Sequence, residues 1–240
     1  MSERILKEQL EAWMRKPALR FLYKEWFQTI REHLVPGPTL EVGGGIGRLK
    51  EYLPDIMTLD IEKTPWTDIV ADAKALPVKK GSLGNIILFD VLHHLPRPVL
   101  FFRQAEQALI PGGRILIMDP YVSPASSVVY RFFHPEHVSF DCDPYNEHKS
   151  LCSDTPFDSN QAVATIMFFR ERQKWASMFP GLTVIKRRRP ALFAYPLTGG
   201  FGGRSYLPEP CILLLAWAER YLRFLAPVFA FRTFIVLAKQ

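Results

Sequence analysis

The feature that most constrains the fold is a glycine-rich stretch that directly follows an apolar segment. The run from Leu40 to Arg48 holds glycines at almost every second position. Glycine adopts positive φ and has no Cβ, so a loop of this kind turns tightly and lets a ligand approach the backbone. The run therefore predicts a strand that ends in a ligand-binding loop. The glycines of this loop are Gly43, Gly44, Gly45 and Gly47.

Two common nucleotide-binding patterns do not fit this stretch. The dinucleotide pattern G-x-G-x-x-G would need a third glycine at position 48, which is Arg48. No Gly-Lys-Ser/Thr follows the loop, so it is not of the phosphate-cradling type either. The sequence thus disfavours a nicotinamide oxidoreductase.

Segments with strand character alternate with segments with helical character after the loop. Continuous apolar runs such as 85–91 are typical of strands buried on both faces of a parallel sheet. The alternation predicts a doubly wound α/β fold. Later strands are expected at 57–61, 69–72, 85–91 and 114–118, from 182 onward and at 233–238, with helices at 49–53, 98–110, 161–179 and 211–224.

Additional segments surround this alternation. Apolar residues three and four apart over the first 30 residues predict amphipathic helices, which Pro17 should divide. The loop-rich stretch 121–160 is typical of a lid or a substrate-binding insertion. We expect an N-terminal helical cap at 1–36 and one domain at 37–240, which carries this lid and a late helical insertion at 199–228.

Aspartates follow the second and third expected strands. Asp60 stands at the end of its strand, where its carboxylate could accept hydrogen bonds from the two hydroxyls of a ribose. Asp72 follows the next strand in the same way. Either residue could instead cap a following helix, because Asp is a good N-cap. Glu41 could likewise bind the amides of its own loop, a role that is compatible with ligand binding.

In its glycine loop and these acidic residues the chain resembles the class I S-adenosylmethionine-dependent methyltransferases, and among them the small-molecule type 11 domains. Their first motif is Glu/Asp-x-Gly-x-Gly-x-Gly, and the resemblance extends over about residues 38–119, including 89–95 and the turn 111–113. It implies a Rossmann-like, mostly parallel seven-stranded sheet and S-adenosylmethionine as cofactor. The implied cofactor contacts are the loop glycines, Glu41, Asp60 (ribose), Ile61, Asp72 and Ala73 (adenine), and Asp90 in the stretch that binds the methionine part.

Methyl transfer from a sulfonium is an in-line displacement, so the enzyme must chiefly align the acceptor and exclude water. If the acceptor is a hydroxyl or an amine, histidine is the side chain best suited to take its proton. His93 and His94 stand where the reactive end of the cofactor should lie, and His137 stands in the lid. A packing role is the alternative for each. We expect no metal, because Pro120 follows Asp119 where a metal-assisted mechanism would want Asn.

The absence of known acceptor-specific motifs narrows the class of acceptor. The Asn/Asp-Pro-Pro-Tyr/Phe motif of amino-directed nucleic-acid methyltransferases does not follow the fourth strand, so nucleic acid is disfavoured. Abundant aromatic and apolar residues outside the cofactor core favour a small or lipid-like acceptor. One alternative is an RNA or protein methyltransferase that uses the basic run 186–189, which could also be a solvated strand end. Another is a noncatalytic scaffold that keeps the cofactor fold.

Composition agrees with a globular chain in a reducing compartment. Three cysteines without C-x-x-C spacing argue against a disulfide framework, and the charged N-terminus does not read as a secretory signal, so we expect a cytoplasmic protein. The formal net charge of +6 is modest. The apolar segment 211–226 is interrupted by charges and is too short to span a membrane. A core or dimer helix is one interpretation, and a surface that contacts lipid at the membrane periphery is the other.

Overall fold

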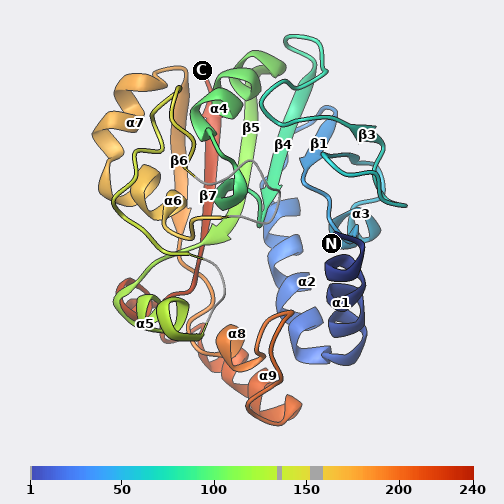
Figure 1. The fold of residues 1–240 in the computed structure, drawn as a ribbon, viewed down its shortest axis with the longest axis vertical. Helices are drawn as coiled ribbons and strands as arrows, with labels where there is room; N and C mark the ends of the chain where they lie inside the picture. Colours follow the sequence, from blue (N-terminus) through green and yellow to red (C-terminus); the bar gives the residue numbers. More distant parts are fainter. Residues whose placement is uncertain (1, 134–136, 152–158) are drawn as a thin grey trace.

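A seven-stranded sheet forms the centre of the computed structural model, which describes residues 2–133, 137–151 and 159–240 (Figure 1). Its strand order is β3-β2-β1-β4-β5-β7-β6, in which β7 runs antiparallel to both neighbours and the remaining pairs are parallel. The prediction of a mostly parallel seven-stranded sheet is confirmed. The strands are β1 (Thr39–Val42), β2 (Met57–Asp60), β3 (Ile69–Val70), β4 (Leu83–Phe89), β5 (Leu109–Pro120), β6 (Leu182–Arg188) and β7 (Arg232–Lys239).

Helices cover both faces of the sheet, which explains the continuous apolar runs of its central strands. In β4, Ile86 and Leu88 pack into one core cluster with α4 and α7, while Ile87 packs into a second cluster with α2 and α3. All three side chains are fully buried. The helices longer than one turn are α1 (Ser2–Arg15), α2 (Pro17–Arg31), α3 (Arg48–Tyr52), α4 (Pro98–Ala108), α5 (Pro124–Phe133), α7 (Arg172–Met178) and α9 (Glu209–Ala218). The short turns are η1 (Leu92–His94), α6 (Val163–Thr165), the π-helical η2 (Ile166–Arg170), α8 (Ala194–Leu197), η3 (Arg223–Leu225) and α10 (Ala226–Phe229).

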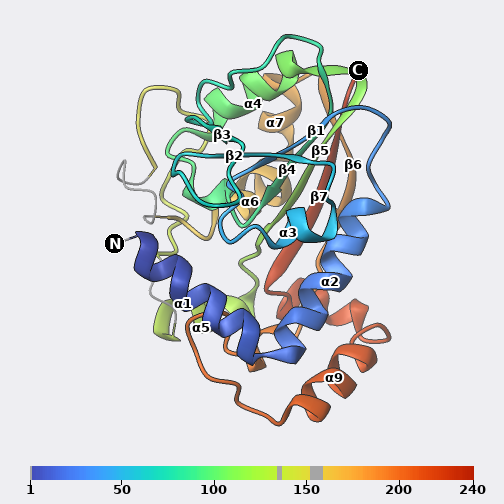
Figure 2. The ribbon, with the colours of Figure 1, turned by 90° about the vertical axis from the view of Figure 1, so that its right-hand side faces the viewer.

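The N-terminal helices are divided at Pro17, as the sequence predicts. Pro17 is the first residue of α2, where its missing amide hydrogen costs nothing. Figure 2 shows α1 and α2 as consecutive helices that meet at an angle at this point. The apolar stripe of α2, which includes Leu19, Trp26 and Ile30, is buried against the sheet.

Several predicted elements end earlier than expected, and for two of them the structure shows the reason. Strand β4 stops at Phe89 rather than continuing to Val91, because Asp90 has a φ of 58° and cannot extend the strand. The helix expected at 211–224 ends at Ala218, where the Glu219 carboxylate accepts hydrogen bonds from the amides of Phe193 and Ala194. Ile212 is the one buried residue among the described residues of α9, so this helix is not a core helix.

The single helix expected at 161–179 is also wrong. The structure has α6, the π-helical η2 and α7, with a break at Glu171. The Tyr145 hydroxyl lies within hydrogen-bonding distance of the carbonyls of Met167 (3.0 Å) and Glu171 (3.2 Å), at the point of the break. A side chain that engages helix carbonyls disturbs the regular ladder. The local sequence around 161–179 contains no sign of this distant tyrosine.

Candidate functional site

The glycine loop follows β1 and has the conformation that its sequence predicts. Gly43, Gly45 and Gly47 have φ values of 76°, 49° and 68°. A Cβ on Gly43 would lie 2.4 Å from Val91 Cγ2, and one on Gly47 would lie 2.3 Å from the Trp66 ring. A Cβ on Gly45 would meet nothing within 4 Å. The loop is thus packed tightly on both sides and is open at Gly45.

Asp60 joins the end of β2 to this open point. Its Oδ2 accepts a hydrogen bond from the Gly45 amide at 3.1 Å, and its Oδ1 accepts one from the Glu62 amide at 3.0 Å. The next residue, Ile61, leaves 51% of its surface exposed although it is apolar. A half-buried carboxylate and an exposed apolar side chain therefore stand beside the opening at Gly45.

Glu41 is buried directly beneath the loop. Its Oε2 lies 3.4 Å from the Thr58 hydroxyl, and in the described part of the chain this hydroxyl, rather than a loop amide, donates to it. Burial raises the pKa of Glu41 to about 8, and the nearby Asp60 carboxylate adds to the rise. Glu41 is therefore mostly protonated at neutral pH.

Asp72 and Ala73 follow β3 and lie half-buried. The Asp72 Oδ1 accepts a hydrogen bond from the Lys74 amide at 2.8 Å, and its Oδ2 lies 3.2 Å from Lys74 Nζ. The carboxylate thus closes a local turn rather than capping a helix. Its contact with an adenine amine stays a prediction.

Asp90 is half-buried and belongs to an ion pair with a buried arginine that the sequence did not indicate. Its Oδ1 pairs with Arg232, the first residue of β7, and its Oδ2 accepts a hydrogen bond from the Tyr23 hydroxyl at 3.2 Å. Arg232 lies over the rings of Trp26, Phe89 and Tyr195 at 4.8 to 5.5 Å. Burial lowers the pKa of Arg232, but Asp90 more than offsets this and raises it overall. The sequence hint of this pair is that Arg232 precedes the apolar run of β7.

The two adjacent histidines lie on η1, just after β4. His93 is buried, and its Nδ1 is 2.9 Å from Oδ1 of Asp119 in β5. Burial raises the pKa of Asp119, while His93 opposes that rise. His94 is half-buried, with its ring centroid 4.1 Å from that of His93. From the sequence, Asp119 is considered only as a potential metal ligand, and its pairing with His93 is not predicted.

The backbone of His137 is linked to the backbone of His93 through the neighbouring residues Asn160 and Gln161. The His137 side chain is exposed, and its carbonyl accepts a hydrogen bond from the Gln161 amide at 3.0 Å. The neighbouring Asn160 donates its amide to the His93 carbonyl at 2.9 Å. The predicted lid thus reaches η1. Parts of that lid, residues 134–136 and 152–158, lie outside the described residues.

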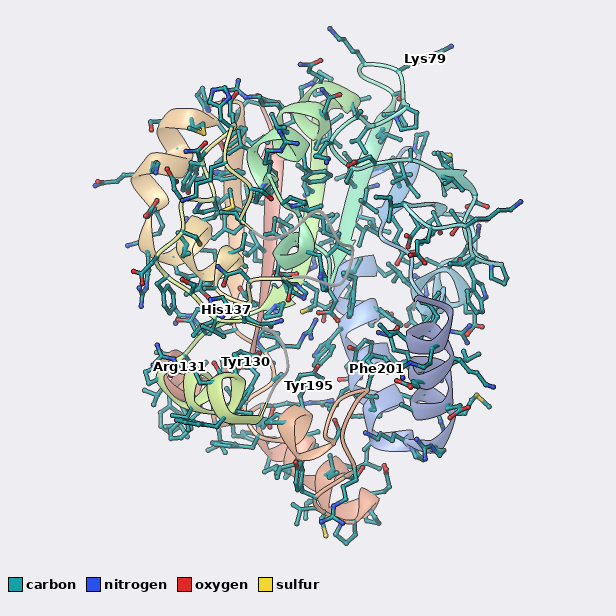
Figure 3. The ribbon with its side chains drawn as sticks, viewed as in Figure 1. Lys79, Tyr130, Arg131, His137, Tyr195 and Phe201 are labelled. Carbon is teal, nitrogen blue, oxygen red and sulfur yellow. The ribbon has the colours of Figure 1, made fainter. Side chains whose placement is uncertain are left out.

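Aromatic side chains from several segments gather at the edge of the sheet where the parallel strands end. Figure 3 shows Tyr130 of α5, Tyr195 of α8 and Phe201 around this edge. The Tyr23 ring of α2 meets Phe201 edge-on at 5.4 Å. We call Tyr23, Trp26, Phe89, Tyr195 and Phe201 the aromatic wall.

Two further features bear on the class of site. Among residues 2–133, 137–151 and 159–240, no group of three or more His, Cys, Asp and Glu side chains could hold a metal ion. Within the same ranges, no helix has both the length and the apolar character needed to cross a bilayer.

Comparison with known proteins agrees with the fold and with the glycine loop. Residues 40–117 match the family model described as a methyltransferase domain, Methyltransf_11. The chain is similar to a SAM-dependent methyltransferase from Archaeoglobus fulgidus, with 14% identity, 92% and 94% of the two chains covered, and a TM-score of 0.56. It is similar in fold to a SAM-dependent methyltransferase of Thermotoga maritima, described as a possible histamine N-methyltransferase, with 14% identity, 99% and 98% covered, and a TM-score of 0.56.

A curated relative is also found, an uncharacterized protein of Methanocaldococcus jannaschii. It is 25% identical over 118 residues, which are 46% of this chain and 57% of the relative. The match thus spans little more than half of the relative's length. Together, the sheet, the loop after β1 and the match over residues 40–117 define a class I methyltransferase fold. The chain thus matches a methyltransferase domain over residues 40–117 and shares its fold with solved SAM-dependent methyltransferases.

Proposed function

We propose that this protein transfers a methyl group from S-adenosylmethionine to a small or lipid-like acceptor. The observation that carries the proposal is the open space next to Gly45, where an added Cβ would meet no atom within 4 Å. Asp60 and Ile61 stand beside this space. These residue types fit the cofactor, because a carboxylate suits ribose hydroxyls and an exposed apolar side chain suits the face of a purine. When bound, S-adenosylmethionine would supply an electrophilic methyl group.

The contacts expected for the cofactor are the amides around Gly43, Gly45 and Gly47, the carboxylate of Asp60 and the side chain of Ile61. Asp72 and Ala73 would contact the adenine edge. Glu41 would support the loop from beneath, since it is buried and bonded to Thr58. Asp90 would help to position the cofactor's amino-acid part from the end of β4.

The aromatic wall supports an acceptor with apolar surface, because apolar walls favour apolar ligands. His93 is the base that we favour, ahead of His94 and His137. The buried Asp119 carboxylate would orient the His93 ring and hold its proton on Nδ1. For a carbon acceptor, or one that is already deprotonated, alignment alone would suffice.

The test is calorimetric titration of the full chain with S-adenosylmethionine, S-adenosylhomocysteine and NAD. We expect the two sulfur ligands to bind and the Asp60→Ala variant to bind them about tenfold or more weakly, which corresponds to loss of a hydrogen-bonded charged group. The matched control is Asp55→Ala, which removes an exposed aspartate just before β2 and should bind like the wild type.

Preference for NAD, or equal binding by both variants, would contradict the cofactor assignment. If the cofactor binds, a labelled-methyl assay with small-molecule, lipid, RNA and protein fractions separates the acceptor classes. Labelling of RNA or protein alone would refute the acceptor proposal. Cofactor binding without turnover on any fraction would favour the scaffold alternative.

A further inference from the structure

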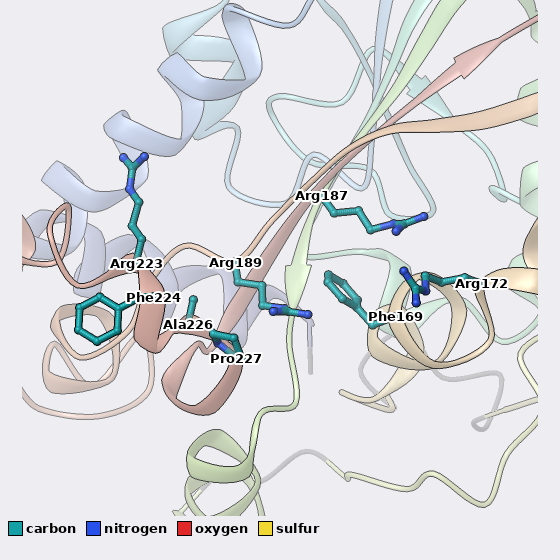
Figure 4. A pocket seen from close by; sticks show the side chains of 8 residues that line it. All are labelled: Phe169, Arg172, Arg187, Arg189, Arg223, Phe224, Ala226 and Pro227. Carbon is teal, nitrogen blue, oxygen red and sulfur yellow. The ribbon is translucent and has the colours of Figure 1, made fainter.

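A basic groove lies beside β6, at the edge of the sheet farthest from β3. Its cavity volume is about 500 Å³, and four arginines line it together with apolar side chains, among them Phe224. Figure 4 shows Arg187 and Arg172 reaching into the same space, Arg189 extending toward Phe169, and Phe224 at the other end. The arginines are Arg172, Arg187, Arg189 and Arg223.

In the part of the chain that the structure describes, carboxylates do not neutralise these arginines. In the described ranges of the chain, none of the four forms an ion pair with a carboxylate. The Nε of Arg189 is buried without a hydrogen-bond partner, although its guanidinium stacks on Phe169 at 4.7 Å and on Tyr121 at 5.0 Å. Buried donors without partners are costly, so the groove is suited to an anionic ligand.

An exposed apolar surface continues from the same end of the groove. Phe224 is 75% exposed, and Trp217 on α9 is 53% exposed with its ring 5.4 Å from that of Tyr221. Large exposed apolar side chains that are close in the sequence, as here between residues 213 and 228, are typical of a binding surface. We call this surface the apolar face, and its members are Leu213, Leu214, Trp217, Tyr221, Phe224 and Val228.

The charges within the same segment do not conflict with an apolar contact. Glu219 is half-buried, and its carboxylate accepts hydrogen bonds from the backbone amides of Leu192 and Phe193. Arg220 pairs with Glu25 of α2 at 2.9 Å. This leaves Arg223, which faces the groove, as the unpaired charge of the segment within the described part of the chain.

We propose that the basic groove and the apolar face together dock on a membrane that contains anionic phospholipid. The arginines would bind headgroup phosphates, and the exposed aromatic and aliphatic side chains would enter the boundary between headgroups and acyl chains. Charge complementarity selects an anionic surface, and the apolar face selects a lipid surface over RNA, whose phosphates would leave Leu214 and Trp217 in water. This proposal does not rest on the proposed methyl transfer.

The test is co-sedimentation of the full chain with vesicles of pure phosphatidylcholine and with vesicles that also contain phosphatidylglycerol. We expect binding to the anionic vesicles only. The variant R172E/R187E should bind about thirtyfold or more weakly, because each basic group near an anionic surface contributes about 1 kcal/mol, or about fivefold, and two are lost. The matched control K79E/K80E reverses two exposed lysines in the loop before β4, which Figure 3 places at the opposite end of the molecule, and should lose less than twofold.

A second variant, Trp217→Ser with Phe224→Ser, tests the apolar face. It should abolish the binding that persists at high salt, since electrostatic attraction is screened there and apolar insertion is not. Equal losses of vesicle binding in R172E/R187E and K79E/K80E would refute the role of the groove. Wild-type binding that is lost at high salt, together with a serine variant that binds like the wild type, would refute the role of the apolar face. Failure to bind anionic vesicles, or tighter binding to single-stranded RNA, would also refute the proposal. Titration with S-adenosylmethionine, unchanged in all variants, separates these outcomes from failure of the proposed function.

Discussion

The protonation of Glu41 gives the sharpest test of the loop's architecture. Its pKa is raised from 4.5 to about 8, chiefly by burial. Between these two values the unfolded chain has released the proton and the folded chain retains it, so the free energy of unfolding falls as pH rises. One pKa unit corresponds to about 1.4 kcal/mol, and the 3.5 units between 4.5 and 8 correspond to about 5 kcal/mol.

The perturbation is Glu41→Gln, which keeps the shape and still offers an oxygen to the Thr58 hydroxyl. The variant has no proton to lose, so its stability relative to the wild type should increase with pH. From pH 5.5 to 7.5 the difference between the two unfolding free energies should grow by about 2.7 kcal/mol in favour of the variant. Above pH 8 the difference should level off.

The assay is urea unfolding followed by circular dichroism at four pH values between 5 and 8.5. Subtracting the wild type from the variant at each pH cancels the other titrating groups. Glu62→Gln, two residues beyond β2, is the matched control and should show no such slope. A difference between Glu41→Gln and wild type that stays constant with pH would refute the assignment of a buried, protonated Glu41.

The remaining predictions concern packing and the ion pair between Asp90 and Arg232. Gly44→Ala should cost about 1–3 kcal/mol, because its Cβ would lie 2.0 Å from Thr58 Cγ2. The change Thr58→Ser removes that methyl group and should restore most of the loss in urea unfolding, whereas an unchanged cost would show that the clash is not the cause. Arg232→Met should cost about 1–3 kcal/mol by leaving the half-buried Asp90 carboxylate without its charged partner. Adding Asp90→Asn should recover part of that cost, and strictly additive losses in a double-mutant cycle would contradict the pairing.

Local signals in the sequence predicted the sheet and the glycine loop. Positive φ at Gly43, Gly45 and Gly47 is confirmed, and it follows from a residue type with no Cβ. The apolar run of β4 and the division at Pro17 also follow from local chemistry. Such features depend on a few adjacent residues, so they can be predicted from one sequence.

The pairings that the sequence does not predict all join distant parts of the chain. Asp90 meets Arg232 because β7 runs antiparallel beside β5 and so begins where the parallel strands end. His93 meets Asp119 because β4 and β5 are neighbours. The break at Glu171 involves Tyr145. None of these contacts has a periodic or spacing signature in the sequence, because each depends on the completed topology.

The topology also explains why the candidate site falls where it does. Strand β1 pairs with β2 on one side and with β4 on the other, so the strand order reverses there. The chain after β1 leads into α3, which packs on one face of the sheet, while the chain after β4 leads to α4 on the opposite face. Connections that diverge in this way leave a crevice at the carboxyl ends of the two strands, which is where ligands bind in open α/β sheets. The glycine loop follows the first of these strands, and Asp90 and His93 follow the second, so the predicted cofactor contacts and the favoured base lie at the carboxyl ends of two neighbouring strands, where this topology favours a ligand site.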